Sequence, residues 1–404
     1  MANKRKKGAK KPPVAIIVTI VVIILVIVIA LVVIYFAAPN VWNKLTSAIM
    51  GNKDNNNQSS TRESTLVRGE GELQFHMLDV GQGDWLLVLL PDGKEMIIDA
   101  GCVSGSSTVY NTSKAYLDNY ITDGQIDYLI ASHSDTDHVV YMDEIIGAYD
   151  VDNIYMPALY ATHSSVAEAD IPAAKTKILD DSGVDKTKCY IETATYAKFY
   201  IAALTEPDCN IYLNLELDKD NNAATLDEHS IITASDNTYS ITFFFENLAF
   251  YNNKKFAGDG HQINGISPTM ILEYNGKRIV FTGDANQQNE PYMIQRLKDY
   301  YGGVIDCDVL KVAHHGSHEG SSENYLKEVK CEYAMVSCNK AGNTFKHPRQ
   351  ETLDRIKAEN MALYRTDLHG TIVCVIDKDG KVTITPTNKD VSETDLWTGA
   401  DTAA

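Results

Sequence analysis

Short apolar runs recur along the chain from about residue 73 onward, and most of them end in Gly, Asp, Asn or His. Runs of this kind, rich in β-branched and aromatic residues, predict β-strands. Most of the runs are apolar at nearly every position, which is typical of strands that are covered on both faces. The clearest runs are LQFHMLDV, WLLVLL, EMIIDAG, IDYLIASH, TMILEYNG, KRIVFTGD, VLKVAHHG, YAMVSCN and TIVCVI.

Turns and helices are predicted between these strands. The dipeptides Asn275-Gly276 and Asp379-Gly380 lie between alternating strands, and two-residue hairpin turns need such pairs because their backbone takes positive φ. Helical stretches are predicted at residues 142–149, 290–300 and 350–360. Buried strands interleaved with helices predict a layered α/β domain.

The N-terminal region predicts a membrane anchor. Residues 14–38 carry no charge, and this length exceeds the roughly 20 helical residues that cross a bilayer. The alternative is a long signal peptide, but its apolar core would be only about 7 to 15 residues, and Pro39 fits poorly behind a cleavage site. Six Lys and Arg precede the span, which predicts a cytoplasmic tail at residues 1–13. We therefore expect a single-pass membrane protein whose remainder is extracellular.

The rest of the chain divides by composition. Residues 39–70 include the polar run GNKDNNNQSST and predict a flexible linker. A folded domain is expected at 71–389, followed by an acidic tail at 390–404. Residues 160–261 are weakly patterned and predict an insertion beside the core, either a lid over a substrate or a purely structural addition.

Charge limits the partners that the chain can bind, and cysteine content limits its metal sites and disulfides. Without the six N-terminal cations the chain has 30 Lys and Arg against 54 Asp and Glu, a net charge of −24. This balance argues against tight binding of a polyanion across the whole surface, although a local basic pocket stays open. The seven cysteines form no C-x-x-C pair, so neither a zinc ribbon nor a dense disulfide framework is predicted. Buried free thiols are expected, with one or two disulfides as the alternative.

Polar side chains follow several predicted strands directly. The hexad His133-x-Asp135-x-Asp137-His138 follows IDYLIAS, and further candidates after later strands are Asp284, His314, His315 and Asn339. Side chains on strand-end loops converge at one rim of an α/β scaffold. Alternation along the hexad predicts that one metal ion binds His133 and Asp135, and a second binds Asp137 and His138. Asp284 could bridge both ions.

These motifs carry a resemblance to a known family. The hexad resembles the H-x-[HD]-x-D-H motif of the metallo-β-lactamase superfamily. The segments around Asp84, Asp99, Asp284, His314 and Asp367 resemble, in consistent order over residues 73–376, the extracytoplasmic hydrolase domain of ComEC-type competence proteins. The resemblance implies a four-layer αββα sandwich.

The resemblance also implies a set of site residues. The implied metal ligands are His133, Asp135, Asp137, His138, Asp284 and one of His314 and His315. Asp79, Asp84 and Asp99 would line or brace the site. Asn264 and Ser267 match a position where superfamily members place a metal-binding His, which weakens the first metal position unless His261 compensates.

Two departures from the family pattern stand out. Val139-Val140-Tyr141 replaces a small turn that follows the hexad, and the bulkier groups would alter helix packing or access to the pocket. ComEC-type proteins carry the domain on a many-helix channel, whereas this chain has one predicted span, so DNA import through this chain alone is excluded.

The predicted cofactors are two divalent metal ions, Zn²⁺ or Mn²⁺. A metal pair supplies hydroxide near neutral pH, and the oxygen-rich ligand set makes Mn²⁺ a rival to Zn²⁺. Asp137, Asp284 and His347 are the candidate catalytic residues. His347, or the non-ligating member of His314 and His315, would protonate a leaving group, although a capped loop His is the alternative. Four cationic residues could form a local anion pocket, and the alternative is that they are solvated surface residues. They are Lys340, Lys346, Arg349 and Arg365.

The resulting hypothesis is a membrane-anchored phosphodiesterase or nuclease with DNA among its candidate substrates. Two alternatives stay open. One is hydrolysis of a smaller or cell-envelope phosphodiester, such as a choline-phosphate ester, and the other is a non-catalytic, metal-stabilised binding module on the cell surface.

Overall fold

The computed structural model describes residues 68–216, 230–303, 305–339 and 344–400. The predicted tail at 1–13, the predicted anchor at 14–38 and almost all of the linker at 39–70 lie outside these residues. Across the described ranges, no helix is both long and apolar enough to cross a membrane.

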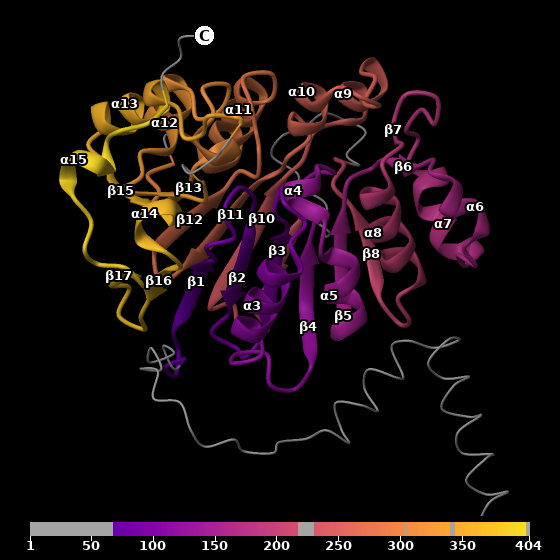
Figure 1. The fold of residues 1–404 in the computed structure, drawn as a ribbon, viewed down its shortest axis with the longest axis horizontal. Helices are drawn as coiled ribbons and strands as arrows, with labels where there is room; N and C mark the ends of the chain where they lie inside the picture. The colour runs from indigo at the N-terminus through magenta and orange to yellow at the C-terminus, as the bar shows by residue number, and fades with distance from the viewer. Residues whose placement is uncertain (1–67, 217–229, 304, 340–343, 401–404) are drawn as a thin grey trace, which may run out of the picture. The chain divides into compact units, whose positions relative to one another are not determined.

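Two sheets form the centre of the domain (Figure 1). The first sheet has the order β17-β16-β1-β2-β3-β4-β5-β8, and the second has the order β15-β14-β13-β12-β11-β10-β9. The strands of the first sheet are β1 (Leu73–Met77), β2 (Trp85–Leu89), β3 (Glu95–Ala100), β4 (Gln125–Ile130), β5 (Asp150–Met156), β8 (Asn210–Leu213), β16 (Ile372–Ile376) and β17 (Val382–Pro386). Those of the second are β9 (Ile231–Thr233), β10 (Tyr239–Phe244), β11 (Thr269–Tyr274), β12 (Lys277–Phe281), β13 (Val309–Lys311), β14 (Tyr333–Val336) and β15 (Ala362–Arg365). A small third sheet pairs β6 (Tyr160–Ala161) with β7 (Tyr190–Ile191).

The two large sheets pack face to face. The ring of Phe75 in β1 meets that of Phe281 in β12 with their centroids 4.9 Å apart. Leu73 and Met77 belong to the same core cluster as Phe75, while His76 points the other way and its Nδ1 lies 2.7 Å from the hydroxyl of Tyr116. Since both faces of β1 are covered, all of its residues are buried, the polar Gln74 and His76 included.

Helices cover the outer faces of both sheets (Figure 1). Residues of α5 and α8 pack on the first sheet, and residues of α11, α12 and α13 pack on the second. This helix–sheet–sheet–helix order confirms the predicted four-layer αββα sandwich. The helices are α3 (Ser107–Leu117), α4 (Thr136–Val139), α5 (Met142–Ala148), α6 (Ser164–Glu168), α7 (Ala173–Asp181), α8 (Ala194–Thr205), α9 (Leu248–Asn253), α10 (Gly260–Asn264), α11 (Glu290–Tyr301), α12 (Glu323–Val329), α13 (Gln350–Ala358), α14 (Thr366–His369) and α15 (Glu393–Leu396), with a 3₁₀ turn η1 (Ala313–Gly316).

The predicted local elements occur where the patterns place them. The Asn275-Gly276 hairpin joins β11 to β12 with Tyr274 opposite Lys277, and the Asp379-Gly380 turn joins β16 to β17. The three predicted helices correspond to α5, α11 and α13. All seven cysteines fall in described residues, and each is a buried free thiol.

The segment 160–261 differs from the expected insertion beside the core. Only β6, α6, α7 and β7 form a peripheral unit, whereas α8 packs on the first sheet and β8 extends its edge. After residue 229 the same segment supplies β9 and β10 to the second sheet. These strands are short and contain Asn, Ser and Thr, so their apolar pattern is weak although their positions are structural.

The C-terminal acidic segment is also integrated as far as the structure describes it. The fully buried guanidinium of Arg365 donates to the carbonyl oxygens of Leu396 and Thr398 at 3.0 and 2.9 Å. Residues 390–400 are therefore tied to the end of β15 rather than frayed.

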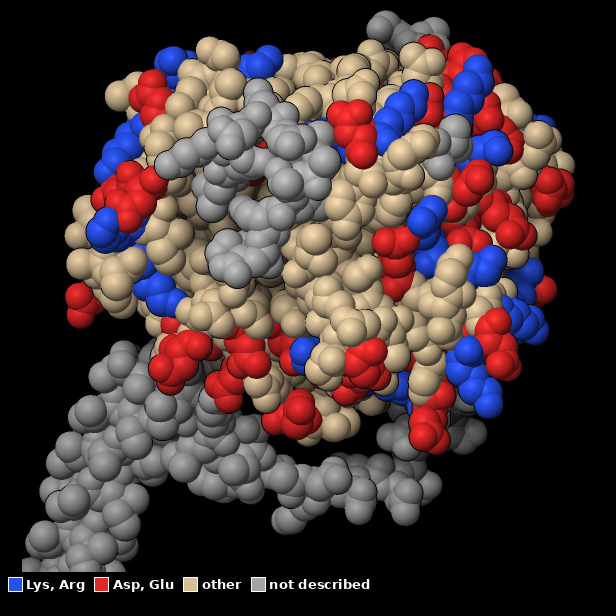
Figure 2. All heavy atoms as spheres, turned by 180° about the vertical axis from the view of Figure 1, so that it is seen from behind, with Lys and Arg blue, Asp and Glu red and all other residues tan. Residues whose placement is uncertain are grey.

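On the face seen in Figure 2, the Lys and Arg side chains of the described residues are interspersed with Asp and Glu and form no broad basic field among those residues. This distribution agrees with the acidic composition of the chain. It offers little support for binding a long polyanion through phosphate contacts alone.

Candidate metal centre

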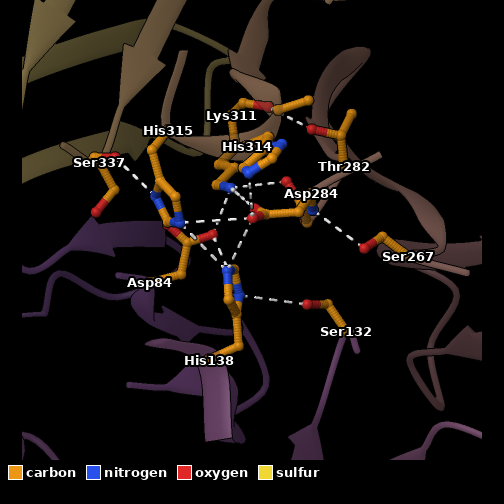
Figure 3. Close-up of polar contacts among 12 residues, drawn as sticks. Asp84, Ser132, His138, Ser267, Thr282, Asp284, Lys311, His314, His315 and Ser337 are labelled. Carbon is orange, nitrogen blue, oxygen red and sulfur yellow. Dashed lines mark hydrogen bonds and ion pairs between the residues drawn. The ribbon is translucent and has the colours of Figure 1, made fainter. Parts of the chain in front are cut away.

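A cluster of imidazoles and carboxylates lies where strands of the two sheets end (Figure 3). The hexad residues follow β4 and begin α4, Asp284 follows β12, and His314 and His315 lie in η1 after β13. Ends of parallel strands bring these distant segments to one rim, as the sequence predicts.

His133 and Asp135, the predicted ligands of one ion, lie near each other and are called the first position here, although the described cluster that contains His133 joins it to His138 and Asp284. The Nε2 atom of His133 lies 3.8 Å from Oδ2 of Asp135 and 4.0 Å from Oδ2 of Asp284. Asn264, at the end of α10, faces this position, since its side-chain nitrogen reaches Oδ2 of Asp135 at 3.1 Å in the amide orientation that satisfies both of its ends. An amide thus stands beside the position where the superfamily has an imidazole.

The second position is formed by Asp137, His138 and His315. The Nε2 atom of His315 lies 3.3 Å from both Oδ2 of Asp137 and Nε2 of His138. All ligand atoms of this group lie within 4.8 Å of one another. His138 and His315 are completely buried, so the second position is enclosed by protein.

Asp284 lies between the two positions. Its Oδ2 atom is 3.3 Å from Nε2 of His138, 3.6 Å from Nε2 of His315 and 3.7 Å from Nε2 of His314. Figure 3 shows these contacts converging on the one carboxylate. The arrangement is the one expected of a bridging ligand.

The second ring nitrogens of the buried histidines are held by the protein. Nδ1 of His138 lies 2.8 Å from Oδ2 of Asp99, and Nδ1 of His315 lies 3.0 Å from the carbonyl oxygen of Ser337. A donor N–H on Nδ1 leaves Nε2 as the atom that faces the centre. Asp99 itself accepts from the backbone N–H and the hydroxyl of Ser132, both at 2.7 Å.

Unusual backbone conformations direct these side chains. Asp99 has φ of 58° and is the extra residue of a β-bulge, since Trp85 pairs with Ala100 and Leu86 pairs with Ile98. A bulge re-aims a side chain that would otherwise follow the alternation of the strand. His314 and His315 also have positive φ, 51° and 53°, a conformation that costs on the order of 1 kcal/mol or more per residue.

Two glycines allow the loops of the centre to approach one another. A Cβ atom at Gly101 would lie only 2.2 Å from the backbone carbon of Asp137, and one at Gly83 would lie 2.7 Å from the carbonyl oxygen of Asp137. The backbone N–H of Asp84 donates to that same carbonyl oxygen at 3.0 Å. The first turn of α4 is therefore fixed by direct backbone contact.

A buried lysine, which the sequence analysis did not single out, lies beside the centre. Lys311 forms an ion pair with Asp84, and its Nζ atom lies 3.8 Å from Oδ1 of Asp284. It also donates to the carbonyl oxygen of Gly283 at 2.9 Å. Lys311 therefore offsets part of the negative charge that the carboxylates bring into a buried site.

The donor set fits divalent cations. Nε2 of His133 and Oδ1 of Asp284 are buried and make no hydrogen bond, which is costly unless a further group completes their coordination. Imidazole nitrogens and carboxylate oxygens are ligands of both Zn²⁺ and Mn²⁺. The residues present thus fit a divalent cation, and the described groups that could hold one include His133, His138 and Asp284, and Asp137, His138 and His315.

The electrostatics of the residues point the same way. Burial and the neighbouring carboxylates of Asp137 and Asp284 raise the pKa of Asp135 to about 7. Burial alone would raise the pKa of Asp284, but the imidazoles of His138 and His315 hold it well below its usual range. The protein therefore gathers carboxylates whose mutual repulsion a cation would relieve.

Other predicted residues lie at varying distances from the centre. The hydroxyl of Ser267 accepts from the backbone N–H of Asp284 at 3.1 Å, and so braces the site. Asp79 is exposed and its backbone contacts Thr371, with no described contact to the histidine cluster. His261 is 3.4 Å from Glu319 and is not among the described residues that contact the centre, so it offers no replacement for the absent imidazole.

His347 and Lys346 lie in the loop between β14 and α13. The ring of His347 lies 5.0 Å from that of His314, which puts it beside the centre. Burial and the charges of His314 and His315 lower the pKa of His347 to about 3. We expected a pKa near 7, whereas at this pKa His347 is neutral at pH 7. Lys346 is exposed, and Lys340 lies outside the described residues.

Comparison with known proteins agrees with the fold. Residues 78–192 match the family model of the metallo-beta-lactamase superfamily, a range that contains the whole hexad. The domain has the metallo-β-lactamase fold. The resemblance that the motifs indicate is thereby confirmed. The fold and the His/Asp clusters indicate a metal-dependent hydrolase.

Two curated relatives are competence proteins. Competence protein ComA of Neisseria gonorrhoeae is 33% identical over 117 residues, which are 29% of this chain and 16% of that protein. ComE operon protein 3 of Bacillus subtilis (strain 168) is 23% identical over 318 residues, 76% of this chain and 33% of that protein. The chain therefore spans a third or less of the length of these relatives. Among solved structures, the metallo-beta-lactamase fold protein YhfI of Bacillus subtilis has a TM-score of 0.39 at 12% identity, over 77% of this chain and 99% of that one.

The aromatic residue after the hexad has a structural role in the metallo-β-lactamase fold domain. The hydroxyl of Tyr141 donates to the carbonyl oxygen of Ser106 at 2.8 Å, and its ring lies 5.5 Å from that of Trp85. The bulkier group thus packs the start of α5 against β2 and the N-terminal end of α3.

Proposed function

We propose that this protein is a metal-dependent phosphodiesterase that cleaves phosphodiesters outside the cell, and that its N-terminal residues 14–38 anchor it in the membrane. The observation that carries the proposal is the position of Asp284, whose Oδ2 lies within 4.0 Å of ring nitrogens of His133, His138 and His315. One carboxylate shared by two sets of ligands suits a pair of cations.

Two divalent cations, when bound, supply hydroxide near neutral pH and stabilise the charge that develops on an attacked phosphoryl oxygen. The residues of the chain prepare for this chemistry. Asp99 and the carbonyl oxygen of Ser337 orient His138 and His315, and Lys311 holds Asp84 in place and offsets its charge. His347 is neutral at pH 7, and its ring lies 5.0 Å from that of His314, at the edge of the centre.

Nucleic acid is the phosphodiester that the comparisons favour, because the relatives are competence proteins. The acidic surface limits how DNA would bind, since no basic field is available to hold a long duplex on the face of Figure 2. We therefore expect a strand end or a short single strand to reach the centre rather than a duplex gripped along its length.

The test is hydrolysis by the full-length protein, purified in detergent and supplied with Mn²⁺ or Zn²⁺. We expect cleavage of single-stranded DNA and of bis-p-nitrophenyl phosphate, and loss of both with Asp284→Ala. Cleavage of a choline-phosphate ester alone would favour the small-diester alternative. Equal, negligible turnover of wild type and Asp284→Ala on all three would favour a binding module without catalysis.

The location of the domain has a separate test. Protease added to intact spheroplasts should degrade the domain, because the proposal places it outside the membrane. Full protection of the domain until the membrane is lysed would contradict the proposed orientation.

A further inference from the structure

A small pocket lies beside the metal centre. It has a volume of about 210 Å³. This is smaller than the roughly 300–1,000 Å³ of pockets that enclose a drug-sized ligand, so it suits one ring system rather than a whole substrate. Its lining includes Gln82, Ser104, Asn339, Thr344, Val103 and Phe345, and no charged residue is among the described residues that line it.

The walls of the pocket are direct chain neighbours of the centre. The loop that contains Gly81 and Gln82 leads into Asp84, and the carbonyl oxygen of Gly83 accepts from the hydroxyl of Ser337 at 2.5 Å. Asn339 follows Ser337 by two residues. On the other side, the ring of Phe345 lies 6.2 Å from that of His347, which in turn lies beside His314. A group in the pocket could therefore be joined covalently to a phosphate at the centre.

The apolar part of the lining is unusually exposed. Among the described residues, the large hydrophobic side chains that are exposed are Val103, at 44%, and Phe345, at 50%, and both belong to this pocket. An aromatic ring left half exposed beside a polar pocket offers a face on which a planar group can stack.

The polar part of the lining supplies both donors and acceptors. The amides of Gln82 and Asn339 each carry an N–H₂ group and a carbonyl oxygen, and Ser104 and Thr344 add hydroxyls. A Cβ atom at Gly81 would lie 3.3 Å from Nδ2 of Asn339, so the absence of a side chain there makes room for this amide in the pocket. Amide groups of this kind pair with the polar edge of a nucleobase.

The same lining disfavours the other candidate substrates. A quaternary ammonium group such as choline is held by several aromatic rings or by a carboxylate, whereas the described lining has one ring and no acid.

We propose that this pocket binds one nucleobase of the substrate, stacked on Phe345 and hydrogen-bonded by Gln82 and Asn339, so that the scissile phosphate next to it reaches the metal centre. The inference rests on the proposed phosphodiesterase function and names its substrate class as nucleic acid strands or nucleotide diesters.

The experiment compares two chromogenic diesters with the same leaving group, thymidine 5′-(p-nitrophenyl phosphate) and methyl p-nitrophenyl phosphate. Full-length wild type should have a lower KM for the thymidine diester. Phe345→Ala should raise that KM about tenfold, which is within the range measured for loss of one base–aromatic stack. The same variant should leave kcat/KM for the methyl diester unchanged, and Phe345→Tyr should retain the wild-type KM.

The outcomes separate this inference from the proposed function. The inference is overturned if wild type has the same KM for the methyl diester as for the thymidine diester. It is also overturned if Phe345→Ala lowers both activities equally, because the pocket then does not bind a base. If neither diester is hydrolysed, the proposed function fails, and binding of thymidine 5′-monophosphate by equilibrium dialysis decides the inference. Binding that weakens about tenfold in Phe345→Ala would uphold it, and absence of binding to wild type would overturn it.

Discussion

The two positions of the metal centre differ in how firmly their ligands are held. At the second position, His138 and His315 are fully buried and each is oriented through Nδ1, by Asp99 at 2.8 Å and by the carbonyl oxygen of Ser337 at 3.0 Å. At the first position, Nδ1 of His133 meets only the hydroxyls of Ser132 and Ser267, at 3.0 and 3.4 Å.

The completeness of the ligand set differs as well. The side chain of Asp135 at the first position is 35% exposed, compared with 18% for Asp137 at the second. Asn264 turns an amide N–H₂ group, which donates to Asp135 and does not bind metal, toward the place where the superfamily has an imidazole. Since oriented ligands lose less entropy on binding, we expect the second position to bind its cation more tightly than the first.

The largest effect is expected from the residue that both positions share. Asp284→Ala should remove both cations and lower phosphodiester turnover by more than about 100-fold, because loss of an outer partner alone costs about 10- to 100-fold. Metal content and turnover measured together test this. Asp181→Ala, an exposed acid paired with Lys177 far from the hexad in sequence, is the matched control and should change neither. Two cations retained in Asp284→Ala would show that Asp284 does not bridge.

The neighbouring histidines after β13 should differ in effect. His315→Ala should release one cation per chain, since its Nε2 lies 3.3 Å from Asp137 and His138. His314→Ala should retain both, because its ring faces Asn264 at 3.4 Å and is 19% exposed. Counting bound metal by mass spectrometry of the purified variants distinguishes them, and the reverse order would invert the assignment of the second position.

A smaller effect on metal affinity is expected from Asp99, which orients His138 at the second position. Asp99→Asn should weaken metal binding at this position by about 10- to 100-fold while the first position keeps its affinity. Competition with a chromophoric chelator gives both affinities. Ser267→Ala, which removes a hydroxyl beside His133 instead, serves as the counterpart, and an identical profile from the two variants would remove the distinction between the positions.

The smallest expected effect is a gain. Asn264→His places an imidazole beside Asp135 and should tighten the first cation about tenfold, which brings the two affinities closer together. The chelator competition used for Asp99→Asn measures it. Unchanged or weaker binding at the first position would show that Asn264 does not face a metal ion.

Sequence patterns predicted the sandwich and most of the centre because both depend on strand ends. The hexad, Asp284 and the His314-His315 pair each follow an apolar run at once, so their convergence follows from the order of the elements. Lys311 was missed because it lies inside such a run, where its side chain direction depends on pairing with a strand of distant sequence.

Other differences have the same kind of cause. Strands β8, β9 and β10 carry polar residues at several positions and become strands through their neighbours in the two sheets. Asp79 was expected at the site because it belongs to a motif that resembles the family. A motif gives the order of residues but not their direction, and the turn between β1 and β2 leaves Asp79 exposed. Which histidine of the pair faces the centre depends on the positive φ of both, which their sequence does not reveal.

The most direct test of a two-cation centre is a chelator titration of the full-length protein in which bound metal and turnover of bis-p-nitrophenyl phosphate are measured in the same samples. We expect two cations per chain, one of which is released well before the other. Turnover should be lost when the cation that is released earlier leaves. A chain that binds no cation, or that keeps its turnover after both are removed, would contradict it.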